Sequence, residues 1–327
     1  MARLLEIDDL RVEFRSAQAV VKAVDGISYT VGAGETVALV GESGCGKSVS
    51  ALAVLGLVPP PGRVAGGSVR FQGRELLGLG EEEIVDMRGR EIAMVFQEPM
   101  TSLNPVLSIG VQLTEGMRRH LGLSRAAAQA RALELLRLVG IADPERRLKQ
   151  YPHHFSGGMR QRVMIAVALS CEPKLIIADE PTTALDVTIQ AQILELMKDL
   201  SRRLGVALVL ITHNLGVVAR YADRVNVMYA GRIVETGTTA EIFARPGHPY
   251  TIGLMASVPR LDVPRSVRLV PIEGQPPDLA GLDQGCSYRP RCGFAIGRCA
   301  EAFPPLDPVE AGHRAACFRK HELRKGS

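Results

Sequence analysis

Four short apolar runs punctuate the first 245 residues and predict the buried strands of a sheet. They are Thr36–Val40, Ile92–Phe96, Leu175–Ala178 and Val206–Thr212. Polar or glycine-rich residues follow these runs, and segments with helical spacing lie between them. This alternation indicates an α/β architecture in which helices cover a sheet.

Two longer segments have the spacing of helices. Residues 124–140 begin with Ser124, a good N-cap, and end with Gly140, a common helix terminator. Residues 186–204 carry one apolar face, made by Ile189, Ile193, Leu196 and Leu200. Such a stripe is typical of a helix that packs on a core.

The chain from residue 246 onward differs in composition. It holds more than half of the chain's 20 prolines, which predicts a loop-rich extension wrapped on the core or on a partner. The whole chain is 46% hydrophobic and has no tryptophan, so we expect a sizeable, mainly aliphatic core.

The formal net charge is +4, too small to indicate nucleic-acid binding, and no nucleic-acid partner is expected. The N-terminus opens with an alternating strand pattern, and no run of 18 apolar residues follows anywhere. We therefore expect a cytosolic protein that reaches a membrane only through partners.

Residues 41–48 match the phosphate-binding pattern G-x-x-x-x-G-K-[ST] between a predicted strand and a predicted helix. The residues expected to contact the nucleotide are Gly41, Glu42, Ser43, Gly44, Cys45, Gly46, Lys47 and Ser48. Backbone N–H groups and the positive end of the following helix favour phosphate there. Lys47 should reach the β- and γ-phosphates of ATP, and the Ser48 hydroxyl should ligate Mg²⁺.

Asp179 and Glu180 end the apolar run that starts at Leu175, and ligands of open α/β sheets bind at such strand ends. Asp179 is expected to hold Mg²⁺, and Glu180 to orient or deprotonate the attacking water. Alone, the pair would read as ordinary solvated acids; the phosphate-binding pattern favours the catalytic interpretation.

Phe155–Arg162 reads Phe-Ser-Gly-Gly-Met-Arg-Gln-Arg and resembles the signature motif of ABC-type ATPases. Most members have Leu-Ser-Gly-Gly-Gln, so two positions differ. Ser156, Gly157 and Gly158 are intact and form a helix N-terminus that can bind an anion. In that family two such domains pack head to tail, which implies that these residues contact the ATP held by a second ATPase chain.

Further motifs carry the same resemblance. Gln97 resembles the Q-loop glutamine that senses Mg²⁺ or water, and Ala184-Leu185-Asp186 resembles the D-loop. His213 resembles the switch histidine that contacts the γ-phosphate. For the aromatic residue that stacks on adenine, Phe14 is the candidate and Tyr29 its rival.

The implied fold is an α/β P-loop ATPase with a RecA-like core, an antiparallel N-terminal β subdomain and a helical subdomain. Residues 1–98 and 163–245 would form the ATP-binding core, and residues 99–162 the helical subdomain with the signature. Residues 246–327 would form the C-terminal extension. The helical subdomain would receive short coupling helices of membrane subunits.

Three segments resemble the oligopeptide/dipeptide importer branch of that family: residues 97–105, 248–251 and 274–279. The resemblance implies a subunit at the cytoplasmic face of the membrane that powers peptide uptake. Its partners would be two membrane permease subunits, an external peptide-binding protein and a second ATPase chain, related rather than identical. An importer for nickel or another solute and a non-transport ABC ATPase stay as alternatives.

Four cysteines cluster in the extension, at Cys286, Cys292, Cys299 and Cys317. Disulfides are rare in cytosolic proteins, so a metal site is the natural interpretation. Four thiolates suit zinc or an iron–sulfur cluster, and the spacing does not separate these. Resemblance to the peptide-importer branch favours a 4Fe–4S cluster, with zinc and plain buried thiols as alternatives. Nearby His313 is expected to be structural.

Overall fold

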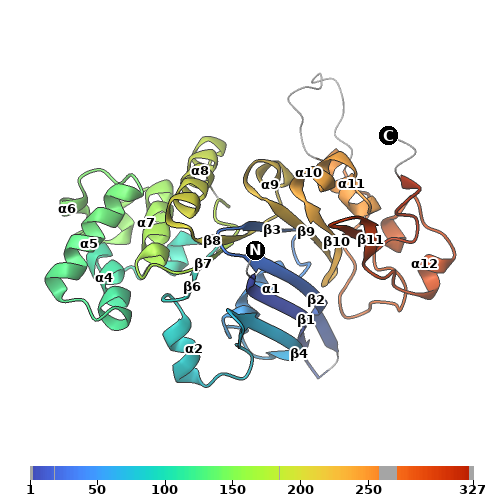
Figure 1. Cartoon of the computed structure of the whole chain (residues 1–327), viewed down its shortest axis with the longest axis horizontal. Coiled ribbons are helices and arrows are strands. Elements are labelled where there is room, and N and C mark those ends of the chain that lie inside the picture. The colour runs from blue at the N-terminus through green and yellow to red at the C-terminus, as the bar shows by residue number, and fades with distance from the viewer. Residues whose placement is uncertain (1–2, 18, 184, 258–270, 324–327) are drawn as a thin grey trace. The chain divides into compact units, whose positions relative to one another are not determined.

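The computed structural model describes residues 3–17, 19–183, 185–257 and 271–323 (Figure 1). These residues form two compact units. Unit 1 comprises residues 32–35 and 78–211, and unit 2 comprises residues 3–31, 36–77 and 212 onward.

Unit 1 contains three parallel strands in the order β8-β7-β6: β6 (Ile92–Val95), β7 (Leu175–Asp179) and β8 (Ala207–Thr212). Leu175 lies opposite Ala207 in the register of β7 and β8. Every residue of β7 and β8 is buried, which explains why these strands read as continuous apolar runs. All three runs were predicted as strands, and they are strands.

The helices of unit 1 are α2 (Glu81–Met87), α3 (Pro99–Ser102), α4 (Ile109–His120), α5 (Arg125–Leu138), α6 (Pro144–Arg147), α7 (Gly157–Leu169) and α8 (Val187–Leu204). A short 3₁₀ turn, η1 (Pro152–His154), precedes α7. The side chains of Ser108 and Ser124 cap α4 and α5 by accepting backbone N–H groups. Figure 1 shows α4, α5 and α7 grouped together, and their buried faces form an aliphatic core.

Helix α8 begins where the Asp186 side chain accepts the N–H of Ile189 at 2.9 Å, and it ends at Gly205 in the left-handed conformation. Its buried positions are Ile193, Leu194, Met197, Leu200 and Ser201. Ile189 and Leu196, predicted to share the core face, are only half-buried. The predicted helix is present, and its core face lies slightly further round the axis than the apolar spacing indicated.

Unit 2 contains an antiparallel sheet in the order β2-β1-β4-β5, formed by β1 (Arg3–Arg15), β2 (Val20–Gly32), β4 (Gly62–Phe71) and β5 (Arg74–Glu75). Its other strands follow the order β11-β12-β10-β9-β3. These are β3 (Thr36–Val40), β9 (Arg224–Tyr229), β10 (Arg232–Thr238), β11 (Asp307–Glu310) and β12 (His313–Ala315). Only β3 and β9 in this group run parallel.

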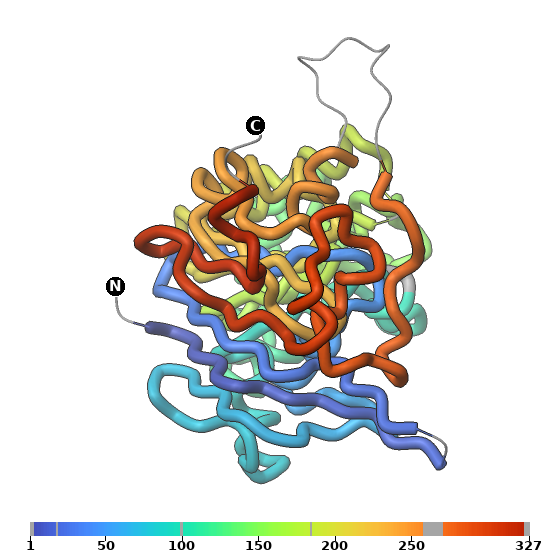
Figure 2. Tube along the Cα trace, turned by 90° about the vertical axis from the view of Figure 1, so that its right-hand side faces the viewer, coloured from blue at the N-terminus to red at the C-terminus, as the bar shows by residue number. Residues whose placement is uncertain are grey.

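The helices of unit 2 are α1 (Lys47–Val54), α9 (Leu215–Tyr221), α10 (Thr239–Ala244), α11 (Pro249–Ala256) and α12 (Arg298–Glu301), with a 3₁₀ turn η2 (Arg289–Arg291). The strand β3 and helix α1 flank the phosphate-binding pattern, as predicted. In Figure 2 the C-terminal extension, orange to red, folds back over strands of its own unit.

The described part of the extension is loop-rich, as predicted, and two short strands attach it to a sheet. Strand β12 pairs with β10, and the extension thereby widens the sheet. The carboxylate of Glu235 lies buried beneath this join and contacts His313 Nε2 at 2.7 Å. Glu235 also accepts the N–H groups of Gly247 and His248, so it ties β12 to the start of α11. His313 therefore contributes to packing, as expected.

Candidate nucleotide-binding site

The phosphate-binding pattern forms the turn between β3 and α1 in unit 2. A Cβ at Gly41 would lie 2.1 Å from the carbonyl oxygen of Met228, and one at Gly46 would lie 2.0 Å from that of Ala23. Gly46 also has a φ of 99°. Glycine is therefore required at both positions by close backbone packing.

Lys47 is buried inside this turn. Its Nζ donates to the carbonyl oxygens of Gly41 and Glu42, each at 2.9 Å, and lies 3.7 Å from Cys45 Sγ. The ammonium group thus has no charged partner among these contacts. Phosphate oxygens would replace neutral carbonyls with charged acceptors, which is the stronger hydrogen bond.

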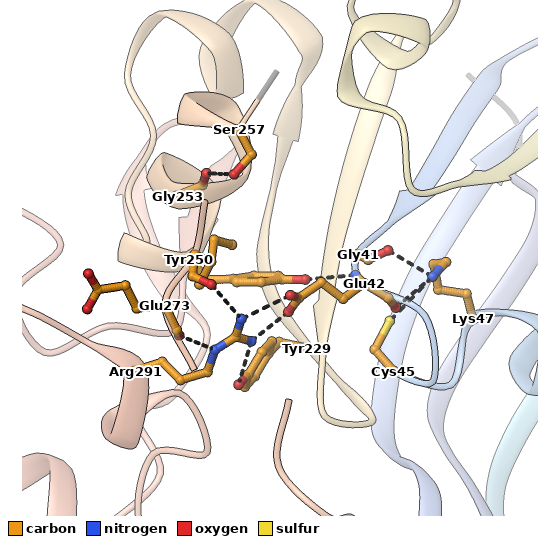
Figure 3. Close-up of polar contacts among 11 residues, drawn as sticks. Gly41, Glu42, Cys45, Lys47, Tyr229, Tyr250, Gly253, Ser257, Glu273 and Arg291 are labelled. Atoms are coloured by element: carbon orange, nitrogen blue, oxygen red, sulfur yellow. Dashed lines mark hydrogen bonds and ion pairs between the residues drawn. The ribbon is translucent and has the colours of Figure 1, made fainter. Parts of the chain in front are cut away.

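Glu42 is held by two residues that the sequence analysis did not identify. Its N–H donates to the hydroxyl oxygen of Tyr250 at 2.8 Å. Its carboxylate receives two hydrogen bonds from the guanidinium of Arg291, at 2.7 and 3.0 Å (Figure 3). Both partners come from residues after 245, so the C-terminal extension contacts the phosphate-binding turn directly.

In unit 1 the carboxylates predicted for catalysis lie at the end of β7. Asp179 is buried, and Glu180 is half-buried with a φ of 44°, unusual for a residue with a side chain. The Glu180 carboxylate accepts hydrogen bonds from Gln97 Nε2 at 3.3 Å and Thr183 Oγ1 at 2.9 Å. The structure thus brings Gln97 and Glu180 together and adds Thr183, which the sequence analysis missed.

The signature residues lie at the N-terminus of α7 in unit 1. Ser156 caps this helix by accepting the N–H of Met159, and both Ser156 and Gly157 are exposed. Phe155, in place of the usual leucine, is buried and anchors the turn. The N-terminus of α7 therefore lies at the surface of unit 1, and the N-terminal end of a helix favours an anion.

The remaining predicted residues have mixed surroundings. His213 is exposed between β8 and α9, and Asp186 uses its carboxylate to cap α8. Phe14 is half-buried on β1. Its rival Tyr29 is buried, which raises its pKa and identifies it as a core residue. Ala184 lies outside the described residues.

The four cysteines of the extension all lie in unit 2 and form no disulfide within the described part of the chain. Burial raises the pKa of the Cys286, Cys292 and Cys317 thiols, that of Cys317 to about 11, and the neighbouring thiols add to the rise. The Cys286 N–H donates to the Cys299 carbonyl oxygen at 2.9 Å. The four thiols are therefore neighbours in space.

Among residues 3–323 that the structure describes, no group of three or more His, Cys, Asp or Glu side chains has an arrangement that could hold a metal ion. The four described thiols are therefore not arranged as a metal site in this structure. In the same described residues, no helix has both the length and the apolar composition needed to cross a membrane.

Comparison with known families gives two matches. The ABC transporter family matches residues 24–183, and the C-terminal region of oligopeptide/dipeptide transporters matches residues 234–299. The second match includes Arg291, Tyr250 and three of the four cysteines of the extension.

Similar proteins cover almost the whole chain. A probable peptide ABC transporter ATP-binding protein, y4tR of Sinorhizobium fredii, is 54% identical over 321 residues, 98% of this chain and 96% of the relative. The oligopeptide transport protein OppD of Bacillus subtilis is 52% identical, covering 98% and 90%. The dipeptide transport protein DppD of the same organism is 50% identical, covering 97% and 95%.

Two solved structures share the fold. The dimeric ATP-binding cassette MJ0796, bound to ADP and Pi, has a TM-score of 0.65 and 26% identity, over 72% of this chain and 99% of that one. The structure of cbiO1 from Clostridium perfringens, part of an ABC transporter complex, has a TM-score of 0.64 and 27% identity, over 75% and 92%.

Proposed function

The chain belongs to the ATP-binding subunits of oligopeptide/dipeptide ABC transporters, and from this membership we propose that it hydrolyses ATP to power import of dipeptides and oligopeptides. The observation that carries the proposal is the sequence identity to the peptide-transport relatives, about half of the aligned positions over nearly the full chain, including the extension. The α/β P-loop fold predicted for an ABC-type ATPase is confirmed by the same similarity.

The sequence motifs support a division of roles. We assign phosphate binding to Lys47 and the N–H groups of residues 41–48, and Mg²⁺ ligation to Ser48, Asp179 and Gln97. Mg²⁺ neutralises charge that develops on the phosphates. Glu180 is the residue whose carboxylate orients or deprotonates the attacking water.

We further assign His213 to the γ-phosphate, and Asp186 and Phe14 to nucleotide contacts at the edge of the site. Ser156, Gly157 and Gly158 serve the ATP of a second ATPase subunit, because α7 presents its N-terminus to the outside. That subunit is a related chain, and the pair is a heterodimer.

An importer of this kind implies two membrane permease subunits and an external peptide-binding protein as partners. The permease subunits would hold this chain peripherally at the cytoplasmic face of the membrane. The helical part of unit 1 has a surface that suits a permease. A hollow of about 740 Å³ lies there, lined in part by Val111, Glu115, Arg118 and Arg125. Val111 is 47% exposed at this hollow, an apolar contact for an inserted helix.

Peptide import is tested by uptake in cells that lack this chain. Uptake of radiolabelled dipeptides and tetrapeptides should fall to background and return when the gene is restored. Uptake of free amino acids and of Ni²⁺ serves as the matched control and should stay unchanged. Normal peptide uptake together with lost Ni²⁺ uptake would replace the peptide assignment with the nickel alternative.

For the cysteines we propose a 4Fe–4S cluster held by Cys286, Cys292, Cys299 and Cys317, with zinc as the alternative. Its support is the donor set itself: four neighbouring thiols, with the Cys317 sulfur accepting the N–H of Arg319 at 3.4 Å. Hydrogen bonds to sulfur of this kind accompany cluster ligation. To ligate one cluster, the four thiol side chains would have to move closer to one another.

Anaerobic purification with iron, sulfide and zinc analysis tests this assignment. We expect about four irons and four sulfides per chain, with a brown absorption spectrum. Cys292→Ser should lose most of the iron, while Cys171→Ser, a buried cysteine in unit 1, should keep it. One zinc and no colour would establish the alternative, and no metal in a folded sample would exclude both.

A further inference from the structure

Glu42 is the second residue of the phosphate-binding pattern, at a position where the pattern accepts any residue. In this chain its carboxylate lies against the guanidinium of Arg291, whose side chain is only 4% exposed. The two hydrogen bonds of 2.7 and 3.0 Å are parallel and charge-assisted (Figure 3). A bidentate, charge-assisted pair of this kind stabilises its two residues more than a surface ion pair does.

Arg291 is itself fixed by the extension and by Tyr229 of β9. Its Nε donates to the carbonyl oxygen of Glu273 at 2.9 Å, and its guanidinium contacts the Tyr229 hydroxyl at 3.4 Å. Arg291 also ends the turn η2 immediately before Cys292, in the cysteine-bearing part of the extension. The position of the guanidinium is therefore set by residues outside the phosphate-binding turn.

Tyr250 holds the backbone of the same residue. Its hydroxyl oxygen accepts the Glu42 N–H at 2.8 Å, and its side chain is fully buried. The ring centroid lies 4.6 Å from that of Tyr229 and 5.4 Å from that of Tyr288. Three packed rings make a rigid support, because each aromatic side chain has few rotamers to lose.

The turn is thus held from both sides at Glu42. Lys47 donates to its carbonyl oxygen from inside the turn, while Arg291 and Tyr250 hold its side chain and its N–H from the extension. When phosphate draws the Lys47 ammonium away, the contacts from the extension still fix the first half of the turn. A turn that is already ordered loses less conformational entropy on binding ATP.

Charge adds a second effect. An unpaired Glu42 carboxylate in this turn would repel the phosphates of ATP, since like charges in one site are unfavourable. Arg291 neutralises that carboxylate. We propose that Arg291 and Tyr250 are positioning residues of the ATP site, through which the C-terminal extension sets the affinity of the phosphate-binding turn for ATP.

The proposal rests on ATP binding at residues 41–48 and on no particular transported solute. It is tested on the full chain by calorimetric titration with MgATP. Arg291→Met should weaken ATP binding by about 30-fold, because it leaves the Glu42 carboxylate unpaired beside the phosphates. At saturating ATP, turnover of the assembled transporter should stay near the wild-type value, so the effect appears in KM.

The neighbouring Arg289 supplies the matched control. It pairs with exposed Asp283 at 3.2 Å and makes no contact with the turn among the described hydrogen bonds. Arg289→Met should change the ATP dissociation constant by less than about twofold, as surface substitutions generally do.

A double variant separates positioning from general destabilisation. Once Glu42→Gln has removed the negative charge, Arg291→Met should weaken binding by less than about threefold, because the two residues act as a pair. An equal loss with and without Glu42→Gln, or unchanged binding in folded Arg291→Met, would overturn the proposal.

Tyr250→Phe keeps the ring and removes the acceptor of the Glu42 N–H. It provides an independent test if Arg291→Met does not fold. It should weaken ATP binding by about fivefold, the cost of one lost hydrogen bond, and unchanged binding would count against the proposal. If the wild-type protein does not bind ATP, the nucleotide site itself is contradicted rather than the role of Arg291 and Tyr250.

Discussion

Replacing Glu180 with glutamine should reduce ATP turnover by about 100-fold or more, the usual contribution of a general base, while ATP still binds. The amide oxygen of glutamine can accept the hydrogen bonds that Gln97 and Thr183 now donate to the carboxylate. The fold around β7 should therefore survive. What is lost is the negative charge and the basicity to which we assign the orientation or deprotonation of the attacking water.

Phosphate release by the assembled transporter measures this effect, and titration with MgATP measures binding. Glu134→Gln supplies the matched control, because Glu134 is exposed on α5 and pairs only with Arg131 among its described contacts. Its turnover should equal that of the wild type. Unchanged turnover in Glu180→Gln would remove Glu180 from the catalytic assignment and leave the role to another residue.

The parts of the fold that follow local patterns could be predicted from the sequence. Strands β6, β7 and β8 are short apolar runs because they are buried on both faces. Strands β11 and β12 could not be predicted in this way. They have four and three residues, β11 contains Pro308, and they exist because β10 offers an edge to pair with.

The same distinction applies to the site. The phosphate-binding turn and the signature are runs of neighbouring residues, so their spacing identifies them. Arg291 lies 249 positions from Glu42 and has no motif of its own, so only the folded chain brings the pair together. Thr183 follows Glu180 closely, but its hydrogen bond depends on the backbone turn at Glu180, which sequence patterns do not reveal.

The exposed N-terminus of α7 leads to the second large effect. Under the proposed head-to-tail pairing, Ser156→Arg should reduce turnover at the partner's ATP site by about 100-fold. Ser156 and Gly157 are exposed, so an arginine side chain can be accommodated in the single chain without disturbing its core. The substitution also removes the Ser156 hydroxyl that caps α7 by accepting the Met159 N–H. In the proposed head-to-tail pair, the arginine side chain would compete with the partner's ATP for the N-terminus of α7.

Two measurements on Ser156→Arg distinguish a role toward the partner from a role within the chain. Binding of MgATP by the isolated chain should change by less than about twofold, because we assign Ser156 to the nucleotide of the partner. Turnover of the assembled transporter should fall by about 100-fold, as when a transition-state donor is lost. Lys47→Ala is the opposite case, since it should remove ATP binding by the isolated chain itself. Loss of binding in isolated Ser156→Arg would place the signature at this chain's own nucleotide, and full turnover in the assembled transporter would contradict the head-to-tail pair.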